Sequence, residues 1–192
     1  MRNVHKQGDF LRMIDSFRYQ PRTGNEVRLA TGGAPVYLYS ELAEQMKAYG
    51  AVNVFNKMMN VSNDAIILLQ DPQKMRSGHW IALKFVPEQR EIYFFSSYGG
   101  KPDFEKNEWI SPNDLVRSNQ YMNVLNDGLK QFALSGWTIH YNQYRYQHVG
   151  DNTATCGIWT AAFLNSGMNP DDFFEFNLVN DLDEGDYYRL LF

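Results

Sequence analysis

Two apolar segments in the middle of the chain do most to constrain its fold. HWIALKFV (79–86) and EIYFFSS (91–97) are separated by only four residues, Pro87 to Arg90. Short apolar runs around a brief polar stretch are typical of paired strands, and this pair predicts a β-hairpin with a loop of about two to four residues. A two-residue loop places His79 directly opposite Ser96, and a four-residue loop makes them diagonal neighbours. Both loop lengths keep the two side chains on one face of the sheet.

Further strand and helix patterns lie on both sides of this hairpin. Ser111 and Pro112 predict a helix start, as N-cap and first-turn residue, and apolar residues then keep helical spacing up to Gly136. The other predicted elements are a loop at 20–35, a helix at 40–49 with Ser40 as candidate N-cap, strands at 65–70 and 137–142, a helix at 156–167 that Gly167 ends, and short helices at 170–178 and 184–192. Strands in the middle with helices around them predict an α+β fold with a central, mostly antiparallel sheet.

Length, charge and cysteine content exclude several classes of protein. A chain of 192 residues is typical of one domain. A single cysteine excludes an internal disulfide framework and fits a reducing compartment. No apolar run has the length of a membrane span, and the N-terminus lacks the apolar region of a secretory signal. The net charge of −4 does not favour a nucleic-acid partner, although the first segment is basic and the last is acidic. Such segments are usually solvated faces, or chain ends that meet.

The single cysteine, Cys156, stands at the predicted start of the helix at 156–167, in TATCGIW. A helix N-terminus favours a thiolate, because its unpaired N–H groups and its macrodipole stabilise negative charge. Thr153 and Thr155 are the candidate N-caps, and Gly157 leaves room for a substrate carbonyl to approach the backbone. Read alone, a cysteine here is more often a buried structural residue. The prediction of a nucleophile therefore needs a base nearby.

Among the four histidines, His79 is the candidate base, because the hairpin brings it close to Ser96. The Ser96 hydroxyl would accept a hydrogen bond from Nδ1 and orient the ring. A zinc site built from His140, His148 and Cys156 is not expected, since their spacing matches no common zinc arrangement. The Gly99-Gly100 pair lacks the context of a phosphate-binding loop and predicts a turn.

The ordered set GHWIAL, IYFFSSYGGKP, Gln147 and TCGIW resembles the adenovirus-type (adenain) and SUMO-protease clan of cysteine peptidases. The similarity covers roughly residues 36–167. The run AIILLQ…GHW also resembles the lead-in strand of maturation proteases from virophages and polinton-like elements. The resemblance implies a papain-like, adenain-like fold with the nucleophile at a helix N-terminus. It implies one cysteine protease domain over 1–192, with an N-terminal segment (1–35), a catalytic core (36–167) and a C-terminal helical segment (168–192).

The resemblance also implies a role for each matching residue. Cys156 would be the nucleophile, and His79 the general base that later protonates the leaving amine. Gln147 would donate its side-chain amide to the oxyanion, together with the backbone N–H of Cys156. Trp80 would pack beside the imidazole and shield it, and Trp80 and Gly157 would contact the substrate.

The sequence departs from the family pattern in two places. Ser96 stands where the family has an acidic residue or Asn, so the site is expected to be a Cys–His dyad with a weak orienter, and Asp103 is an alternative. Gln147 precedes Cys156 by nine residues, more than is usual in the family, so Gln143 and Asn152 are alternative oxyanion donors.

The resemblance implies a viral maturation endopeptidase that cleaves capsid or other virion precursors after small residues such as Gly-Gly. The partner would be a protein or peptide substrate, and neither a cofactor, a metal, a nucleic acid nor a membrane is expected. The protein would act as a monomer in the cytoplasm of the infected cell and in the virion. The alternatives are an isopeptidase acting on ubiquitin-like proteins and an acetyltransferase of the same clan.

Overall fold

The structure is a computed structural model that describes residues 22–147 and 154–192. Its centre is a five-stranded sheet in which the strands follow one another in sequence order. The strands are β1 (Val36–Leu38), β2 (Asp64–Asp71), β3 (Lys74–Val86), β4 (Glu91–Ser96) and β5 (Thr138–Tyr141). The helices are α2 (Gly24–Ala30), α3 (Tyr39–Tyr49), α4 (Ala51–Val61), α5 (Lys106–Trp109), α6 (Pro112–Arg117), α7 (Val124–Leu134), α8 (Cys156–Ser166), α9 (Pro170–Asn180) and α10 (Glu184–Leu191).

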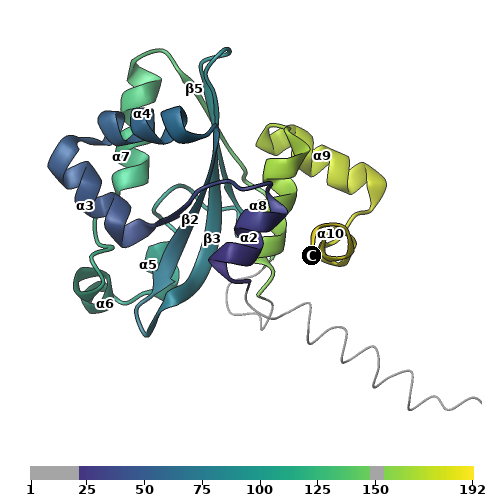
Figure 1. Ribbon diagram of the computed structural model, residues 1–192, viewed down its shortest axis with the longest axis horizontal. Coiled ribbons are helices and arrows are strands. Elements are labelled where there is room, and N and C mark those ends of the chain that lie inside the picture. The colour runs from purple at the N-terminus through teal and green to yellow at the C-terminus, as the bar shows by residue number, and fades with distance from the viewer. Residues whose placement is uncertain (1–21, 148–153) are drawn as a thin grey trace, which may run out of the picture.

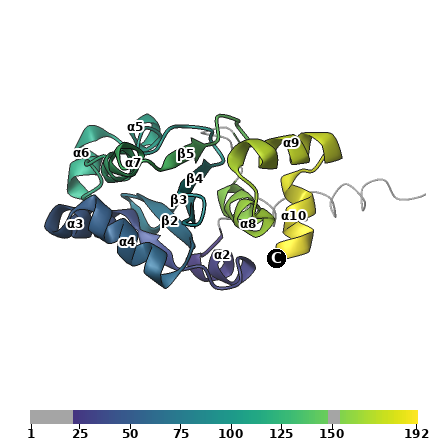
Figure 2. The ribbon, with the colours of Figure 1, turned by 90° about the horizontal axis from the view of Figure 1, so that it is seen from above.

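Helices cover both faces of the sheet (Figure 1). Helices α3, α4 and α7 lie on one face and α2 and α8 on the other, and the view from above shows the same two groups (Figure 2). Each face has its own apolar core. Phe55 and Phe85 belong to the core under α3, α4 and α7. Phe95 and Phe163 stack with ring centroids 4.5 Å apart in the core under α8. Successive side chains along β3 and β4 point to opposite faces, so each strand contributes residues to both cores.

The predicted hairpin is confirmed, with the longer of the two loops. Val86 pairs with Glu91, so the loop has four residues, and Ile81 lies opposite Ser96. His79 is two residues beyond Ile81 on β3, which makes it a diagonal neighbour of Ser96 on the same face.

The sheet is mixed, not mostly antiparallel. Strands β2, β3 and β4 pair antiparallel, but β1 pairs parallel with β2 and β5 pairs parallel with β4. Helices α3 and α4 connect β1 to β2, and α5 to α7 connect β4 to β5. Parallel neighbours need long crossover connections of this kind, and these helices supply them.

The structure differs from the helices predicted for the first two thirds of the chain. The loop predicted at 20–35 contains α2, which starts at a capping box between Thr23 and Glu26. Ser40 lies inside α3, whose N-cap position is Leu38, without a side-chain bond. The helix predicted from 112 to Gly136 is two helices, α6 and α7, separated where Asn119 has a φ of 56°. Helix α4 lies in a stretch to which the sequence pattern assigned no element.

The break between α6 and α7 has a polar cause. The Gln120 side chain accepts a hydrogen bond from the Gln70 N–H at 2.8 Å and donates one to the Gln70 carbonyl at 2.8 Å. Both residues are buried. The helix is therefore interrupted where the Gln120 side chain forms hydrogen bonds with the N–H and carbonyl of Gln70 near the end of β2.

The C-terminal elements follow the prediction closely. Helix α8 ends at Gly167, which has a φ of 68°, and α9 and α10 occupy nearly the predicted ranges. The described start of the basic segment meets the acidic end of the chain here, because the Arg22 guanidinium lies 5.4 Å from the Tyr188 ring centroid and 5.8 Å from that of Phe192. In the described ranges, no helix is long and apolar enough to cross a membrane.

Gly78 sets the path of β3 just before His79. The register between β2 and β3 shifts after Gln70, which pairs with Gly78. Gly78 has a φ of 152°, and a Cβ on it would lie 1.9 Å from the Leu69 carbonyl oxygen. Only glycine fits this bulge, and the bulge fixes where the His79 side chain starts.

We expect Gly78→Ala to lower the free energy of unfolding by about 1–3 kcal/mol, because the added methyl group forces the two strands apart. Chemical denaturation followed by far-UV circular dichroism measures this loss. Gly32→Ala is the matched control, since Gly32 has a φ of 70° but no described atom within 4 Å of an added Cβ. It should lose only about 1 kcal/mol. Equal losses in the two variants would show that the bulge is not sterically constrained.

Candidate active site

Cys156 is the first residue of α8, at the end of the helix that faces the ends of β3 and β4. Its side chain is buried, with 6% exposed. Thr155 occupies the N-cap position but makes no side-chain bond to the helix, so the first N–H groups of α8 are not capped by it. The Thr160 hydroxyl donates to the Trp80 carbonyl at 3.1 Å, which fixes α8 against β3. The thiol therefore stands at a helix N-terminus that the Thr155 side chain does not cap, held close to the strand that carries His79.

His79 is 2% exposed, and its two ring nitrogens have different surroundings. Nε2 lies 2.9 Å from the Ser96 hydroxyl oxygen and 3.4 Å from a carboxylate oxygen of Glu105. Nδ1 is buried and has no hydrogen bond of standard geometry to any described residue. Catalytic contacts are often loose without substrate. The predicted bond from Ser96 to Nδ1 is wrong, because the structure places the hydroxyl at Nε2 and so leaves Nδ1 for the thiol.

The two candidate groups shift each other's ionisation. Burial, the largest effect, lowers the pKa of His79, but hydrogen bonding and charge from Cys156 and Glu105 outweigh it and raise the pKa to about 9. Burial raises the pKa of the Cys156 thiol. The His79 imidazole and the backbone N–H groups of Trp80 and Gly157 outweigh that effect, so the thiol pKa is lowered. Both shifts favour a thiolate–imidazolium pair.

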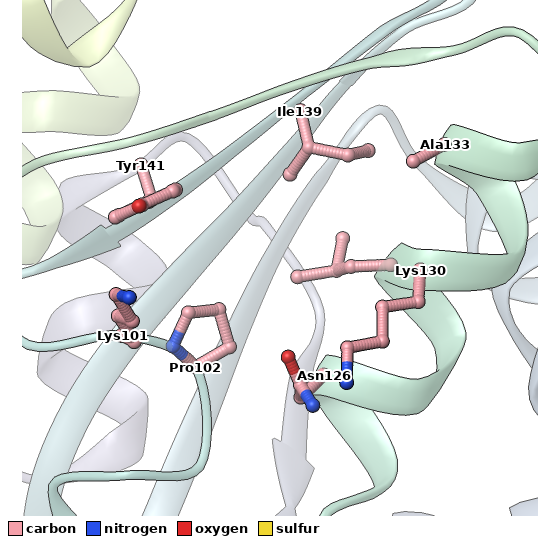
Figure 3. Close-up of a pocket in the computed structure, with 8 residues that line it drawn as sticks. Lys101, Pro102, Asn126, Lys130, Ala133, Ile139 and Tyr141 are labelled. Carbon is pink, nitrogen blue, oxygen red and sulfur yellow. The ribbon is translucent and has the colours of Figure 1, made fainter.

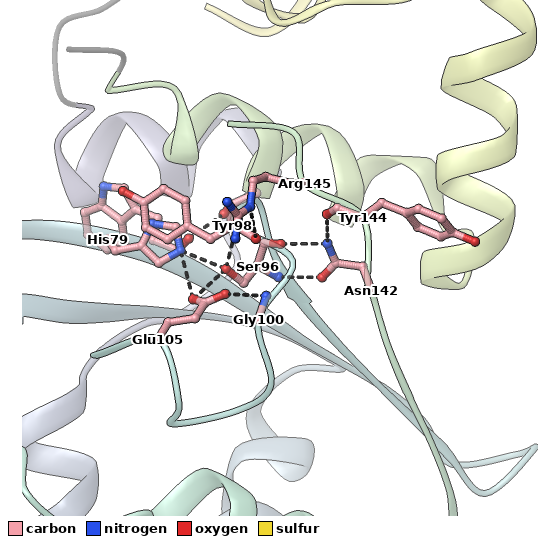
Figure 4. A network of polar contacts seen from close by, with 10 residues as sticks. His79, Ser96, Tyr98, Gly100, Glu105, Asn142, Tyr144 and Arg145 are labelled. Atoms are coloured by element: carbon pink, nitrogen blue, oxygen red, sulfur yellow. Dashed lines mark hydrogen bonds and ion pairs between the residues drawn. The ribbon is translucent and has the colours of Figure 1, made fainter. Parts of the chain in front are cut away.

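Glu105 is the residue that the sequence analysis missed (Figure 4). It is 2% exposed and comes from the loop after β4, nine residues beyond Ser96. One carboxylate oxygen accepts the Ser96 hydroxyl hydrogen at 2.7 Å, and the other accepts the Gly100 N–H at 2.8 Å. A Cβ on Gly100 would lie 2.3 Å from Glu105 Cγ, so the glycine allows this close approach. The chain turns at Ser97 and Tyr98, where the Gly99 N–H donates to the Ser96 carbonyl at 3.0 Å, just before the predicted Gly99-Gly100 turn. A turn in this region was the available signal, because it sends the following acidic residues back toward the strand ends.

Asp103, the alternative orienter, lies elsewhere and does not reach His79. Its carboxylate accepts hydrogen bonds from the Tyr39 hydroxyl and, at 2.7 Å, from the Asn126 N–H. The ammonium group of Lys106 lies 3.9 Å from it and donates to Tyr39 at 2.7 Å. Burial lowers the pKa of Lys106 to about 8. This cluster anchors the loop around Glu105 to α3 and α7.

A tyrosine takes the place beside the imidazole that Trp80 was expected to fill. The Tyr98 ring stacks on His79 with centroids 3.9 Å apart and an interplanar angle of 13°. The Trp80 indole instead packs in the core under α8 and donates to the Arg22 carbonyl at 2.9 Å. Trp80 contributes to the site through its backbone N–H near Cys156.

Gln147 lies next to the residue that precedes the nucleophile. Its side-chain oxygen accepts a hydrogen bond from the Thr155 hydroxyl at 2.9 Å. The amide nitrogen is therefore not engaged by Thr155 and can donate to another group. Its backbone N–H donates to the Ser97 carbonyl at 3.2 Å. Gln143, an alternative donor, is exposed, and Asn152, the other, lies outside the described residues together with Thr153.

Asn142 connects this segment to Ser96. Its amide accepts the Ser96 N–H at 2.9 Å and donates to the Ser96 carbonyl at 2.7 Å and the Tyr144 carbonyl at 2.9 Å. Figure 4 shows this continuous set of contacts from His79 to Tyr144. One buried amide thus ties Ser96, the expected orienter of His79, to the segment that leads to Gln147.

Gly157 faces inward, not toward an open groove. A Cβ on Gly157 would lie 2.9 Å from Arg22 Cβ and 3.0 Å from Val27 Cγ2. The glycine therefore allows α2 and the residue before it to pack on α8. Its backbone N–H still points to the sulfur, as the lowered pKa of Cys156 indicates.

Two other features lie apart from the site. His140 is 3.5 Å from Glu91, and His148 lies outside the described residues; in the described ranges no group of three or more His, Cys, Asp or Glu could hold a metal. A pocket of about 280 Å³ opens between α7, β5 and the loop after Gly100, lined among others by Lys101, Pro102 and Tyr141 (Figure 3). Neither Cys156 nor His79 lines this pocket.

Comparison with known proteins places the chain in a viral family. No protein-family model matches it. The central domain of the uncharacterized Lpg1148 protein from Legionella pneumophila aligns over 78% of this chain and 77% of its own, with 17% identity and a TM-score of 0.35, a level that does not establish a shared fold. Uncharacterized protein V9 of Sputnik virophage is 32% identical over 126 residues, which are 66% of this chain and 67% of V9. The chain therefore belongs to the same family as Sputnik virophage protein V9.

Proposed function

We propose that the protein is a cysteine endopeptidase in which Cys156 attacks the peptide carbonyl and His79 transfers the protons. The observation that carries the proposal is the buried pairing of Cys156 and His79, whose pKa values move in the directions that form an ion pair. A structural cysteine in an apolar core has its pKa raised by burial, and the lowered pKa of Cys156 is typical of a reactive thiol.

The proposed reaction has two halves. The Cys156 thiolate forms a bond to the substrate carbonyl carbon, and the carbonyl oxygen becomes an oxyanion. As the C–N bond breaks, Nδ1 of the His79 imidazolium gives its proton to the leaving amine. His79 then takes a proton from water, the resulting hydroxide adds to the thioester, and the carboxylic acid leaves as the thiolate is restored.

The oxyanion would form next to two donors of this chain. The backbone N–H of Gly157 in the first turn of α8 interacts with the sulfur, and the amide of Gln147 is oriented by Thr155 beside it. Donors that are fixed before the reaction stabilise the developing charge without reorganisation. The bond from Thr155 to Gln147 supports Gln147 over Gln143 in this role.

The proposed substrate is a capsid or other virion precursor, cut after small residues such as Gly-Gly in the infected cell or the virion. The relation to a virophage protein supports a viral role. The Gly-Gly preference rests on the resemblance to the adenain and SUMO-protease clan alone. An isopeptidase uses the same chemistry, and an acetyltransferase would load an acyl group onto the same thiol.

A substrate panel tests the proposal. We expect hydrolysis of a fluorogenic peptide that ends in Gly-Gly, and complete loss of that hydrolysis in Cys156→Ala. Processing of full-length ubiquitin-like substrates without peptide cleavage would favour the isopeptidase. Stable acetylation of Cys156 by acetyl-CoA, seen by mass spectrometry, would favour the acetyltransferase. Hydrolysis that persists in Cys156→Ala would rule out the proposed nucleophile.

Gln147→Ala is expected to reduce kcat about 10²–10³-fold while KM stays nearly constant, because the contact forms mainly in the transition state. Steady-state kinetics on the Gly-Gly peptide measures both constants. Gln143→Ala, an exposed change of the same chemistry four residues earlier, is the control and should leave both constants unchanged. The reverse pattern would assign the donor role to Gln143.

The pH dependence of kcat/KM is expected to be bell-shaped. The rising limb reports deprotonation of the Cys156 thiol. Its midpoint lies at a lower pH than that of an ordinary thiol, because the pKa of Cys156 is lowered. The falling limb reports loss of the imidazolium proton and lies near pH 9, because the His79 pKa is raised to about 9. A falling limb near pH 6.5, the ordinary imidazole value, would contradict the ion pair.

A further inference from the structure

We propose that Glu105 is the positioning residue that gives His79 its orientation and its charge, with Ser96 as the link between them. In this arrangement a carboxylate from the loop after β4 acts on the ring through the serine at the end of β4. The inference deepens the proposed function and rests on it only in taking Cys156 and His79 as the reactive pair.

The hydrogen bonds of Ser96 determine which ring nitrogen of His79 carries a proton. A hydroxyl has one hydrogen and two lone pairs. Ser96 donates its hydrogen to the Glu105 carboxylate at 2.7 Å, since an ionised carboxylate can only accept. It accepts the Tyr98 N–H at 3.2 Å, so a lone pair faces His79 Nε2 at 2.9 Å. Nε2 must therefore carry the hydrogen, and in the neutral ring Nδ1 is the basic nitrogen.

Charge reaches His79 directly as well as through Ser96. The Glu105 carboxylate oxygen lies 3.4 Å from Nε2, and both side chains are almost fully buried. At that separation in a water-poor site, an opposite charge strongly favours the imidazolium. Among residues 22–147 and 154–192, the titratable groups around the ring are Cys156 at the start of α8, Glu105 before α5, and Tyr98 stacked on its face. Of these, Glu105 lies on the Nε2 side of the ring and Cys156 interacts with it from the start of α8.

The loop that carries Glu105 is held on both sides. On one side Gly100 donates its N–H to the carboxylate and allows its close approach. On the other side Lys106 is fully buried and bonded to the Tyr39 hydroxyl. These contacts give a loop residue the fixed geometry that a strand residue has.

The roles of Ser96 and Glu105 predict unequal effects of substitution. Ser96→Ala removes the orienting hydroxyl but leaves the carboxylate 3.4 Å from Nε2. Glu105→Gln keeps the shape and removes the charge. The charge-removing change is therefore expected to disturb the ionisation of the pair more than the loss of the hydroxyl.

The experiment measures the Cys156 thiolate directly, by the pH dependence of alkylation with iodoacetamide and by thiolate absorbance against a Cys156→Ser blank. We expect Glu105→Gln to reduce the alkylation rate at neutral pH about tenfold or more, with the rate profile moved to higher pH. Ser96→Ala should move it less. Glu108→Gln is the matched control, because Glu108 is an exposed carboxylate three residues on in α5, and should leave the profile unchanged.

The results separate this inference from the proposed function, since the thiolate assay needs no substrate. A shifted profile in Glu105→Gln without hydrolysis of any substrate would uphold the role of Glu105 and reject the peptidase. Hydrolysis with equal profiles for Glu105→Gln and Glu108→Gln would reject the role of Glu105 alone. A larger shift in Ser96→Ala than in Glu105→Gln would also overturn it.

A second measurement leaves the His79 network intact, which covers the case that Glu105→Gln does not fold. Nitrogen-15 NMR of Cys156→Ser should show the neutral His79 ring with its hydrogen on Nε2, and the opposite tautomer would overturn the inference. Restoration of a carboxylate is the positive test. We expect Ser96→Asp in a Glu105→Ala background to recover the alkylation profile that Glu105→Ala loses, and no recovery in a folded double variant would count against the charge role.

Discussion

A carboxylate buried to 2% exposure at the end of the sheet is the constraint on which the rest of the candidate site depends. An ionised group removed from water is tolerated only if its oxygens are bonded and an opposite charge is near. Glu105 meets this requirement with the Gly100 N–H, the Ser96 hydroxyl and the His79 ring. Each of these partners is thereby fixed in turn. The glycine cannot accept a side chain, the serine hydroxyl has its hydrogen directed to the carboxylate, and the neutral imidazole has one tautomer.

The sheet brings together groups that belong to its two opposite faces. His79 and Ser96 lie on the face covered by α3, α4 and α7, whereas Cys156 packs with the core under α8. They meet because both sets lie at the same end of the sheet, where β3 passes the bulge at Gly78 and α8 begins. The thiol and imidazole are thus supported by separate cores, and neither core can shift without moving one member of the pair.

Local patterns predicted much of this architecture. Apolar runs and their spacing were enough for the central hairpin, the shared face of His79 and Ser96, and the nucleophile helix, because those features depend on neighbours in sequence. The choice between the two possible loop lengths came only from the structure. The parallel edge strands were not predictable in this way, since β1 is three residues long and its pairing with β2 depends on two intervening helices. The break after α6 was also hidden, because Gln120 leaves the helix for a partner 50 positions earlier.

The same distinction applies to the site. Cys156, His79, Ser96 and Gln147 could be selected by residue type and order, and the structure places them close together. Glu105 could not be distinguished from Asp103 or Glu108, because the three carboxylates stand within six positions of one loop and α5. Only the path of the chain after Gly100 decides that Glu105 faces the imidazole while Asp103 faces Tyr39 and Lys106.

The origin of the site in four distant stretches of chain has a consequence for how the protein matures. Residues 79, 96, 105, 147 and 156 come together only once separate strands, loops and α8 have packed on one another, because no single helix or hairpin carries them all. Until then the cysteine has neither its imidazole partner nor an organised helix N-terminus, so its thiol has the ordinary reactivity of an unfolded chain. Enhanced nucleophilicity is therefore a property of the completed fold, and a nascent or misfolded copy carries a thiol of ordinary reactivity only.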